Sequence, residues 1–206
     1  MIQIQDSSPA PTSLRDRLIE AGMTLLERDG VAGMTLRKTA SLAGVSHAAP
    51  AHHFDGLPGL MTAIATKAFQ RFCVSMEARM AEAPTDRVSQ LHAICAGYLD
   101  FAAEHAGLFH AMFQNDQVSR SDEELQKASK RAYDLLRQAC APFSTTRDQL
   151  FETTVWSLVH GYAQLGFQRQ VGQQRGQLLV PAFSDCLDKL IAEKCKAPVA
   201  PDGVPD

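Results

Sequence analysis

The sequence predicts an all-α protein with a small N-terminal three-helix module followed by a larger helical body. Two observations lead to this expectation. Apolar residues recur at helical spacing from Leu14 onwards. Beyond Pro84, no stretch alternates apolar and polar residues as a half-buried strand does. With 206 residues and 45% hydrophobic content, the chain has enough apolar material for a substantial core.

Composition and spacing divide the chain into four parts. Residues 1–12 and 197–206 are rich in Pro, Ser and Asp and are expected to be disordered tails. Residues 13–56 form the small module. Residues 57–196 comprise a linking helix and the helical body.

The small module starts with an amphipathic helix over residues 13–28, which Asp29 and Gly30 end. Thr35 is placed to cap a second helix of about two turns, which is stable only if it docks on its neighbours. Gly44 is placed to end that helix in the left-handed conformation.

A third helix is expected to begin at Ser46, its candidate N-cap, and Pro50 predicts that this helix is short or slightly irregular. Two short helices joined by a tight glycine turn are a helix-turn-helix candidate. The usual use of this motif is to place its second helix in a DNA groove.

The body is predicted to be helical throughout. A linking helix is expected from Leu57 to about Ala81, with Pro58 in its first turn. Residues 150–167 are apolar on nearly every face, so this segment and the helix near the C-terminus are expected to pack against a second copy of the chain. The expected dimer-interface residues are Leu158, Leu165, Phe183, Leu187 and Leu190.

Composition argues against several classes. The apolar runs are far shorter than the ~20 residues of a membrane helix, and no signal peptide is apparent, so a cytoplasmic location is expected. The cysteines are scattered singly, which indicates core residues rather than a metal or disulfide site. No metal and no cofactor is expected. A net charge of −3 argues against a generally nucleic-acid-coating protein but leaves room for a compact contact surface.

Three stretches resemble a known family. "GMTLRKTASLAGVSHAAPAHHF" resembles the DNA-binding domain of TetR-type transcriptional regulators. "EHAGLFHAMF" and "WSLVHGYAQL" are similar to the C-terminal domain of the subgroup named for its Trp-His-Gly element, here Trp156, His160 and Gly161. The resemblance implies an all-helical homodimer that represses transcription until a small molecule enters the C-terminal domain and moves the two reading heads apart.

The resemblance implies phosphate contacts by Thr35, Arg37 and His53, and base contacts from the start of the third helix. The expected DNA-binding residues are Thr35, Arg37, Ser46, His47, Ala48, Ala49, His52 and His53. Two positions depart from the family pattern, because Ala51 replaces its usual tyrosine and Leu57 its usual lysine. Two phosphate contacts are therefore absent, for which His52 compensates in part.

A ligand pocket is expected in the body, and its aromatic walls favour an apolar or aromatic small molecule with one polar handle. The expected lining residues are Phe101, His105, Phe109, Met112, Phe113, Trp156 and His160. Trp156 and His160 are one helical turn apart and face the same way, which suits a structural role equally well.

Two other function classes stay open. An enzyme is disfavoured, since no nucleophile elbow, phosphate-binding loop or carboxylate and histidine set at metal spacing is present. A dimeric helical interaction protein with a degenerate DNA-binding surface is compatible with Ala51 and Leu57.

Overall fold

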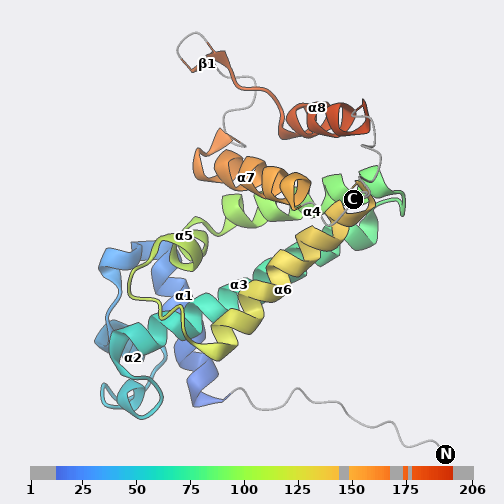
Figure 1. The fold of residues 1–206 in the computed structure, drawn as a ribbon. Coiled ribbons are helices and arrows are strands. Elements are labelled where there is room, and N and C mark those ends of the chain that lie inside the picture. The colour runs from blue at the N-terminus through green and yellow to red at the C-terminus, as the bar shows by residue number, and fades with distance from the viewer. Residues whose placement is uncertain (1–12, 144–148, 168–173, 176–177, 197–206) are drawn as a thin grey trace, which may run out of the picture. The chain divides into compact units, whose positions relative to one another are not determined.

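The computed structural model describes residues 13–143, 149–167, 174–175 and 178–196. The predicted tails, 1–12 and 197–206, lie outside the described residues. The described chain is helical apart from one minimal hairpin, as Figure 1 shows. Within it, no helix combines the length and apolar character that crossing a bilayer requires.

The predicted all-α fold class is confirmed. The α-helices are Leu14–Asp29 (α1), Leu36–Leu42 (α2), Gly56–Glu82 (α3), Arg87–Glu104 (α4), Ala106–Gln114 (α5), Glu123–Cys140 (α6), Leu150–Gln164 (α7) and Phe183–Lys196 (α8). Short 3-10 helices cover Val31–Gly33 (η1), Ala49–His52 (η2) and Ala141–Phe143 (η3). Strands Gln174–Arg175 (β1) and Leu178–Leu179 (β2) pair antiparallel. Two residues are too few for an alternating pattern, so the sequence did not predict these strands.

The chain forms two compact units, and each is discontinuous in sequence. The first contains Met1–Ala68 and Gly107–Gln126, and the second contains Phe69–Ala106 and Lys127–Asp206. Helix α3 is one unbroken helix that supplies residues to both units. The domain boundary predicted at residue 57 stays a prediction.

In the first unit, α1 and α2 pack together around fully buried side chains such as Leu18 and Leu26. The predicted cap of α2 is confirmed, because the Thr35 side chain accepts a hydrogen bond from the Lys38 backbone N–H. Gly44 is left-handed, with φ of 69°, as predicted. The Gly44 N–H donates to the Ser41 carbonyl at 3.2 Å, and the Val45 N–H donates to the Ala40 carbonyl at 3.0 Å. These two hydrogen bonds form a Schellman motif.

Helix α5 docks on the end of α1 in the same unit. The Glu27 carboxylate accepts hydrogen bonds from the N–H groups of Gly107 and Leu108, each at 3.3 Å, and so satisfies two amides that the first turn of a helix leaves unpaired. The two backbones approach closely, because a Cβ on Gly107 would lie 2.7 Å from the Leu26 carbonyl oxygen. The "EHAGLFHAMF" stretch therefore includes a helix–helix contact that requires glycine.

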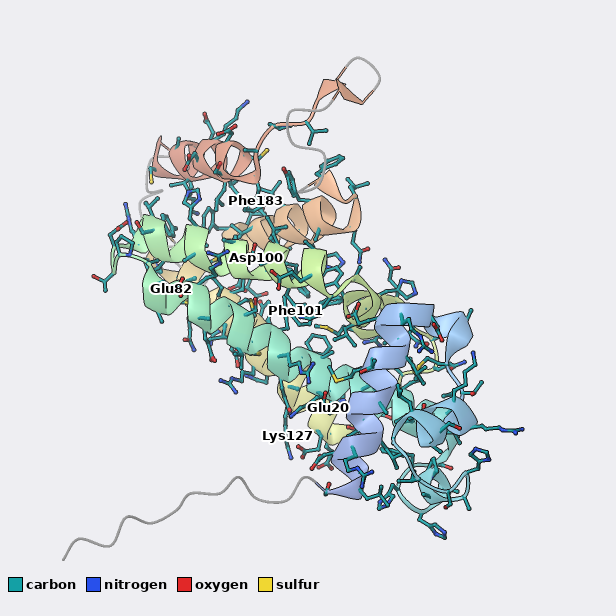
Figure 2. All side chains as sticks on the ribbon, turned by 180° about the vertical axis from the view of Figure 1, so that it is seen from behind. Glu20, Glu82, Asp100, Phe101, Lys127 and Phe183 are labelled. Carbon is teal, nitrogen blue, oxygen red and sulfur yellow. The ribbon has the colours of Figure 1, made fainter. Side chains whose placement is uncertain are left out.

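In the second unit, α4 lies beside the end of α3, and α7 packs between α4 and α8 (Figure 1). Phe72 of α3 meets Tyr98 and Phe101 of α4 with ring centroids 4.6 and 5.2 Å apart. Figure 2 shows Phe101 directed from α4 toward α3. Gly97 allows the two helices to approach, since a Cβ there would lie 2.6 Å from the Ser75 carbonyl oxygen and 2.7 Å from Met76 Cα.

We predict that Gly97→Ala lowers the free energy of unfolding by about 1–3 kcal/mol, because the new methyl group meets backbone atoms that side-chain rotation cannot move. Gly161→Ala is the matched control. It is also a helical glycine, but nothing lies within 4 Å of the position that a Cβ would take there, so removal of a helical glycine should stabilise by about 0.5–1 kcal/mol. Urea unfolding at one protein concentration measures both, and equal effects would contradict the steric account.

Candidate functional site

The predicted DNA-binding segment is held to α1 by two arginines. Arg17 Nη2 donates to the Ala43 carbonyl at the end of α2, at 2.7 Å. The Arg15 guanidinium lies 5.4 Å from the centroid of the Phe54 ring, and Phe54 itself is buried. The segment between Ala43 and Phe54 is therefore fixed at both ends, although it contains little regular structure of its own.

The third helix of the module is not an α-helix, which corrects the expectation of a helix capped by Ser46. A turn at residues 47–48 leads into the 3-10 helix η2. The cause is Pro50, since an α-helix from Ser46 needs a Pro50 N–H to bond the Ser46 carbonyl, and proline has none. Ala49 donates to that carbonyl instead, at 3.0 Å, which is the tighter 3-10 spacing.

All of the predicted DNA-binding side chains reach solvent. Ala49 is half-buried, and the rest are exposed: Thr35, Arg37, Ser46, His47, Ala48, His52 and His53. Ala51 is exposed and Leu57 is half-buried. Both side chains are apolar, so neither position presents a polar group.

Thr35 and Arg37 line a hollow of about 590 Å³ on the first unit. Arg28, Lys38 and Ser41 line it as well, so its walls carry three cations and two hydroxyl groups. Arg28 is paired with Asp29 at 2.7 Å, and Lys38 Nζ donates to the Gly33 carbonyl at 3.0 Å. Neither Arg28 nor Lys38 was predicted as a DNA-binding residue. Arg28 belongs to α1, and no spacing rule relates it to α2.

The second unit holds a polar cluster around Tyr98, which is 2% exposed. The Tyr98 hydroxyl lies 2.8 Å from His160 Nδ1 and is also hydrogen-bonded by Trp156. The other ring nitrogen of His160, Nε2, lies 3.3 Å from the side-chain amide nitrogen of Gln164, so both nitrogens of this imidazole have side-chain partners. Trp156 and His160 thus share a face of α7, as predicted, and both contact one residue of α4.

Burial controls the ionisation of this cluster. Burial raises the pKa of Tyr98 well above its usual range, and the hydrogen bond from Trp156 opposes this shift only in part. Burial also lowers the pKa of His160 from 6.5. Both groups are therefore neutral at pH 7, and the cluster offers hydrogen-bonding atoms without a net charge.

The predicted pocket residues fall in both units. Phe109, Met112 and Phe113 lie on α5 in the first unit, where the rings of Phe109 and Phe113 are 5.0 Å apart. Phe101, His105, Trp156 and His160 lie in the second unit. There, the Phe101 and His105 rings are 4.9 Å apart, and the ring of Trp156 is 5.5 Å from that of Tyr133.

A groove of about 570 Å³ in the second unit was not predicted from the sequence. Its lining includes Arg79, Glu82, Ala93, Ala96, Leu99 and Phe183. Figure 2 labels two of these lining residues, Glu82 and Phe183. Arg79 bonds Asp100 at 2.6 Å, and His92 bonds Asp188 at 2.7 Å, so its polar rim is internally paired. Residues from α3, α4 and α8 form it, and no spacing rule joins them.

The predicted dimer-interface residues differ in exposure. Leu165 is 52% exposed, Leu158 and Leu190 are half-buried, and Phe183 and Leu187 are buried within the chain itself. In the described part of the chain, no three His, Cys, Asp or Glu side chains gather as a metal site requires.

The C-terminal half of the chain is similar to a known family of domains. Residues 91–189 match the family model of the "Tetracyclin repressor-like, C-terminal domain". The match includes α7 with Trp156 and His160, and also their partner Tyr98. Curated protein sequences yield no match.

Solved structures share the fold. A protein with unknown function from Rhodococcus sp. RHA1 is 25% identical, with a TM-score of 0.72 over 91% of this chain and 98% of that chain. The TetR family transcriptional regulator PfmR from Thermus thermophilus is 20% identical, with a TM-score of 0.57 over 88% and 96%. The regulator FadR from Bacillus subtilis, in complex with stearoyl-CoA, is 11% identical, with a TM-score of 0.61 over 87% and 97%.

We predict that stability falls as the pH drops below 6.5, because the lowered pKa of His160 makes the unfolded chain bind the proton more readily than the folded chain. This contribution is fully present above pH 6.5 and is lost as the pH falls through the interval down to the folded pKa. Urea unfolding between pH 5 and 8 measures the slope. His160→Gln should flatten it, and an unchanged slope in that variant would contradict the assignment to His160.

Proposed function

We propose that the chain is a homodimeric, ligand-responsive transcriptional regulator that binds operator DNA through residues 35–53. The observation that carries this proposal is the segment 46–53, which is exposed except at Ala49 and Pro50, is anchored by Arg17 and Phe54, and lies close to a hollow with three cations. Basic groups and free amides suit phosphates, while short exposed side chains let the backbone approach base edges. The match of residues 91–189 supports the same class.

We assign the second unit to the Trp-His-Gly subgroup and propose repression that a small hydrophobic molecule relieves. The polar cluster of Tyr98, Trp156 and His160 supports this assignment, because neutral hydrogen-bonding groups beside aromatic walls suit an apolar ligand with one polar handle. The FadR structure contains stearoyl-CoA, so long-chain acyl compounds belong in a first ligand screen.

We propose that ligand binding in the second unit affects the DNA-binding segment through α3 and α5. Helix α3 is continuous through both units, and α5 carries three predicted ligand contacts. The Glu27 carboxylate joins the first turn of α5 to α1, so a displacement of α5 acts on the helix that Arg17 connects to the DNA-binding segment. A ligand shifts this equilibrium only by its differential affinity for the two states.

We expect a random-sequence duplex library to yield a near-palindromic site, since a dimer presents two heads about one DNA turn apart. The double variant His47→Ala, His53→Ala should bind the selected duplex about tenfold or more weakly, with two hydrogen bonds lost. Titration by fluorescence anisotropy at fixed salt measures this. The double variant Thr24→Ala, Ser129→Ala, altered away from the site, is the control.

Failure to select any duplex would reject DNA binding and favour the interaction protein, for which the apolar Ala51 and Leu57 are the supporting observation. Unchanged affinity of the histidine variant would reject only the residue assignment. Salt dependence provides a second criterion, because each phosphate contact contributes about one unit to the slope of log affinity against log salt.

Dimerisation is proposed through α7 and α8. Leu165 is the informative position, because it is exposed in the single chain and an aspartate there would carry a charge into the interface. Leu165→Asp should sediment as a monomer. Val74→Asp, at an equally exposed apolar residue of α3, is the control and should remain dimeric. Leu187 is fully buried within the single chain. Leu187→Asp would therefore disturb the fold of the subunit and would not report on the dimer interface alone.

A further inference from the structure

Ser41 and His47 form a contact within the DNA-binding segment that neither the proposed function nor any resemblance assigns. The Ser41 hydroxyl of α2 lies 3.1 Å from Nε2 of the His47 imidazole. Both residues are exposed, so burial does not force this contact. It joins the end of α2 to the turn that precedes η2.

The contact leaves His47 with one ring nitrogen available. Nε2 is occupied by Ser41, and Nδ1 has no hydrogen-bond partner among the described residues. An imidazole ring with both nitrogens unpaired can rotate and present either of them. The bond to Ser41 fixes which nitrogen faces outward and reduces the side-chain entropy that binding would otherwise cost.

We propose that Ser41 is a positioning residue that makes His47 a reader of guanine through Nδ1–H, an inference that rests on the proposed DNA binding. When the Ser41 hydroxyl donates to Nε2, the ring proton resides on Nδ1, and His47 becomes a hydrogen-bond donor. The strongly negative potential of DNA also favours a ring that donates outward.

Guanine is the base that fits this donor best. Its major-groove edge presents two acceptors, N7 and O6, whereas cytosine presents a donor there and adenine combines an acceptor with a donor. Thymine presents one acceptor beside a methyl group. The small side chains of Ala48 and Ala49 next to His47 leave room for such a base edge to approach.

The backbone around the pair is fixed, which makes the orientation of His47 meaningful. Arg17 bonds the Ala43 carbonyl at 2.7 Å, and Gly44 adopts a φ of 69° that only glycine tolerates readily. The Ala49 N–H bonds the Ser46 carbonyl at 3.0 Å. Ser41 and His47 are therefore held on either side of a turn that is closed at both ends.

The test compares base discrimination at every position of a duplex selected by the wild-type protein. Wild type should prefer guanine at one position in each half-site. Ser41→Ala and His47→Ala should each lower that preference about two- to tenfold, the value of one hydrogen bond. The double variant Ser41→Ala, His47→Ala should lose no more than His47→Ala alone. Ser41→Thr retains the hydroxyl and should restore the preference. Thr24→Ala, which removes an exposed hydroxyl from α1, should have no effect.

Nitrogen NMR of the imidazole in the free, full-length protein provides a readout without DNA. Ser41→Ala should move the His47 Nε2 resonance, and Ser41→Thr should not. An unmoved resonance, or a guanine preference that His47→Ala removes and Ser41→Ala leaves intact, overturns the positioning role. Selection of a half-site without guanine overturns the base assignment. A protein that selects no duplex at all refutes the proposed function, a different result from loss of discrimination at one position.

Discussion

Helix α3 is the constraint on which the described structure depends. Its first half supplies Leu60 and Ile64 to the first unit, and its second half supplies Phe72 and Met76 to the other, all 2% exposed or less. A helix buried along this much of its length cannot be removed or bent without disturbing both cores. Each unit is also discontinuous in sequence, because the chain leaves the first unit within α3 at Ala68 and comes back to it at Gly107.

Local signals allowed the ends of the helices to be predicted from the sequence. The cap at Thr35 and the left-handed turn at Gly44 each depend on a few neighbouring residues. The effect of Pro50 was only partly foreseen. A shortened helix was expected, but the exchange of an α-helical bond for a 3-10 bond from Ala49 depends on which donor replaces the missing N–H.

Contacts between distant parts of the chain were beyond prediction. The one-turn spacing of Trp156 and His160 indicated a shared face, yet nothing in that spacing identifies Tyr98 as their common partner. The bonds from Gly107 and Leu108 to Glu27 are similar, because the residues are about 80 positions apart in sequence. Such pairings are determined by packing, and a single sequence contains no periodic signal for them.

The composition of the first unit has a consequence for synthesis of the protein. Its residues come from two stretches, and the second ends at Gln126. During translation, the first 68 residues emerge without α5, so the amides of Gly107 and Leu108 are not yet available to Glu27. The ribosome must therefore pass residue 126 before every residue of the first unit is available, and a fragment that keeps only α1 and α2 lacks the contacts that α5 makes with α1.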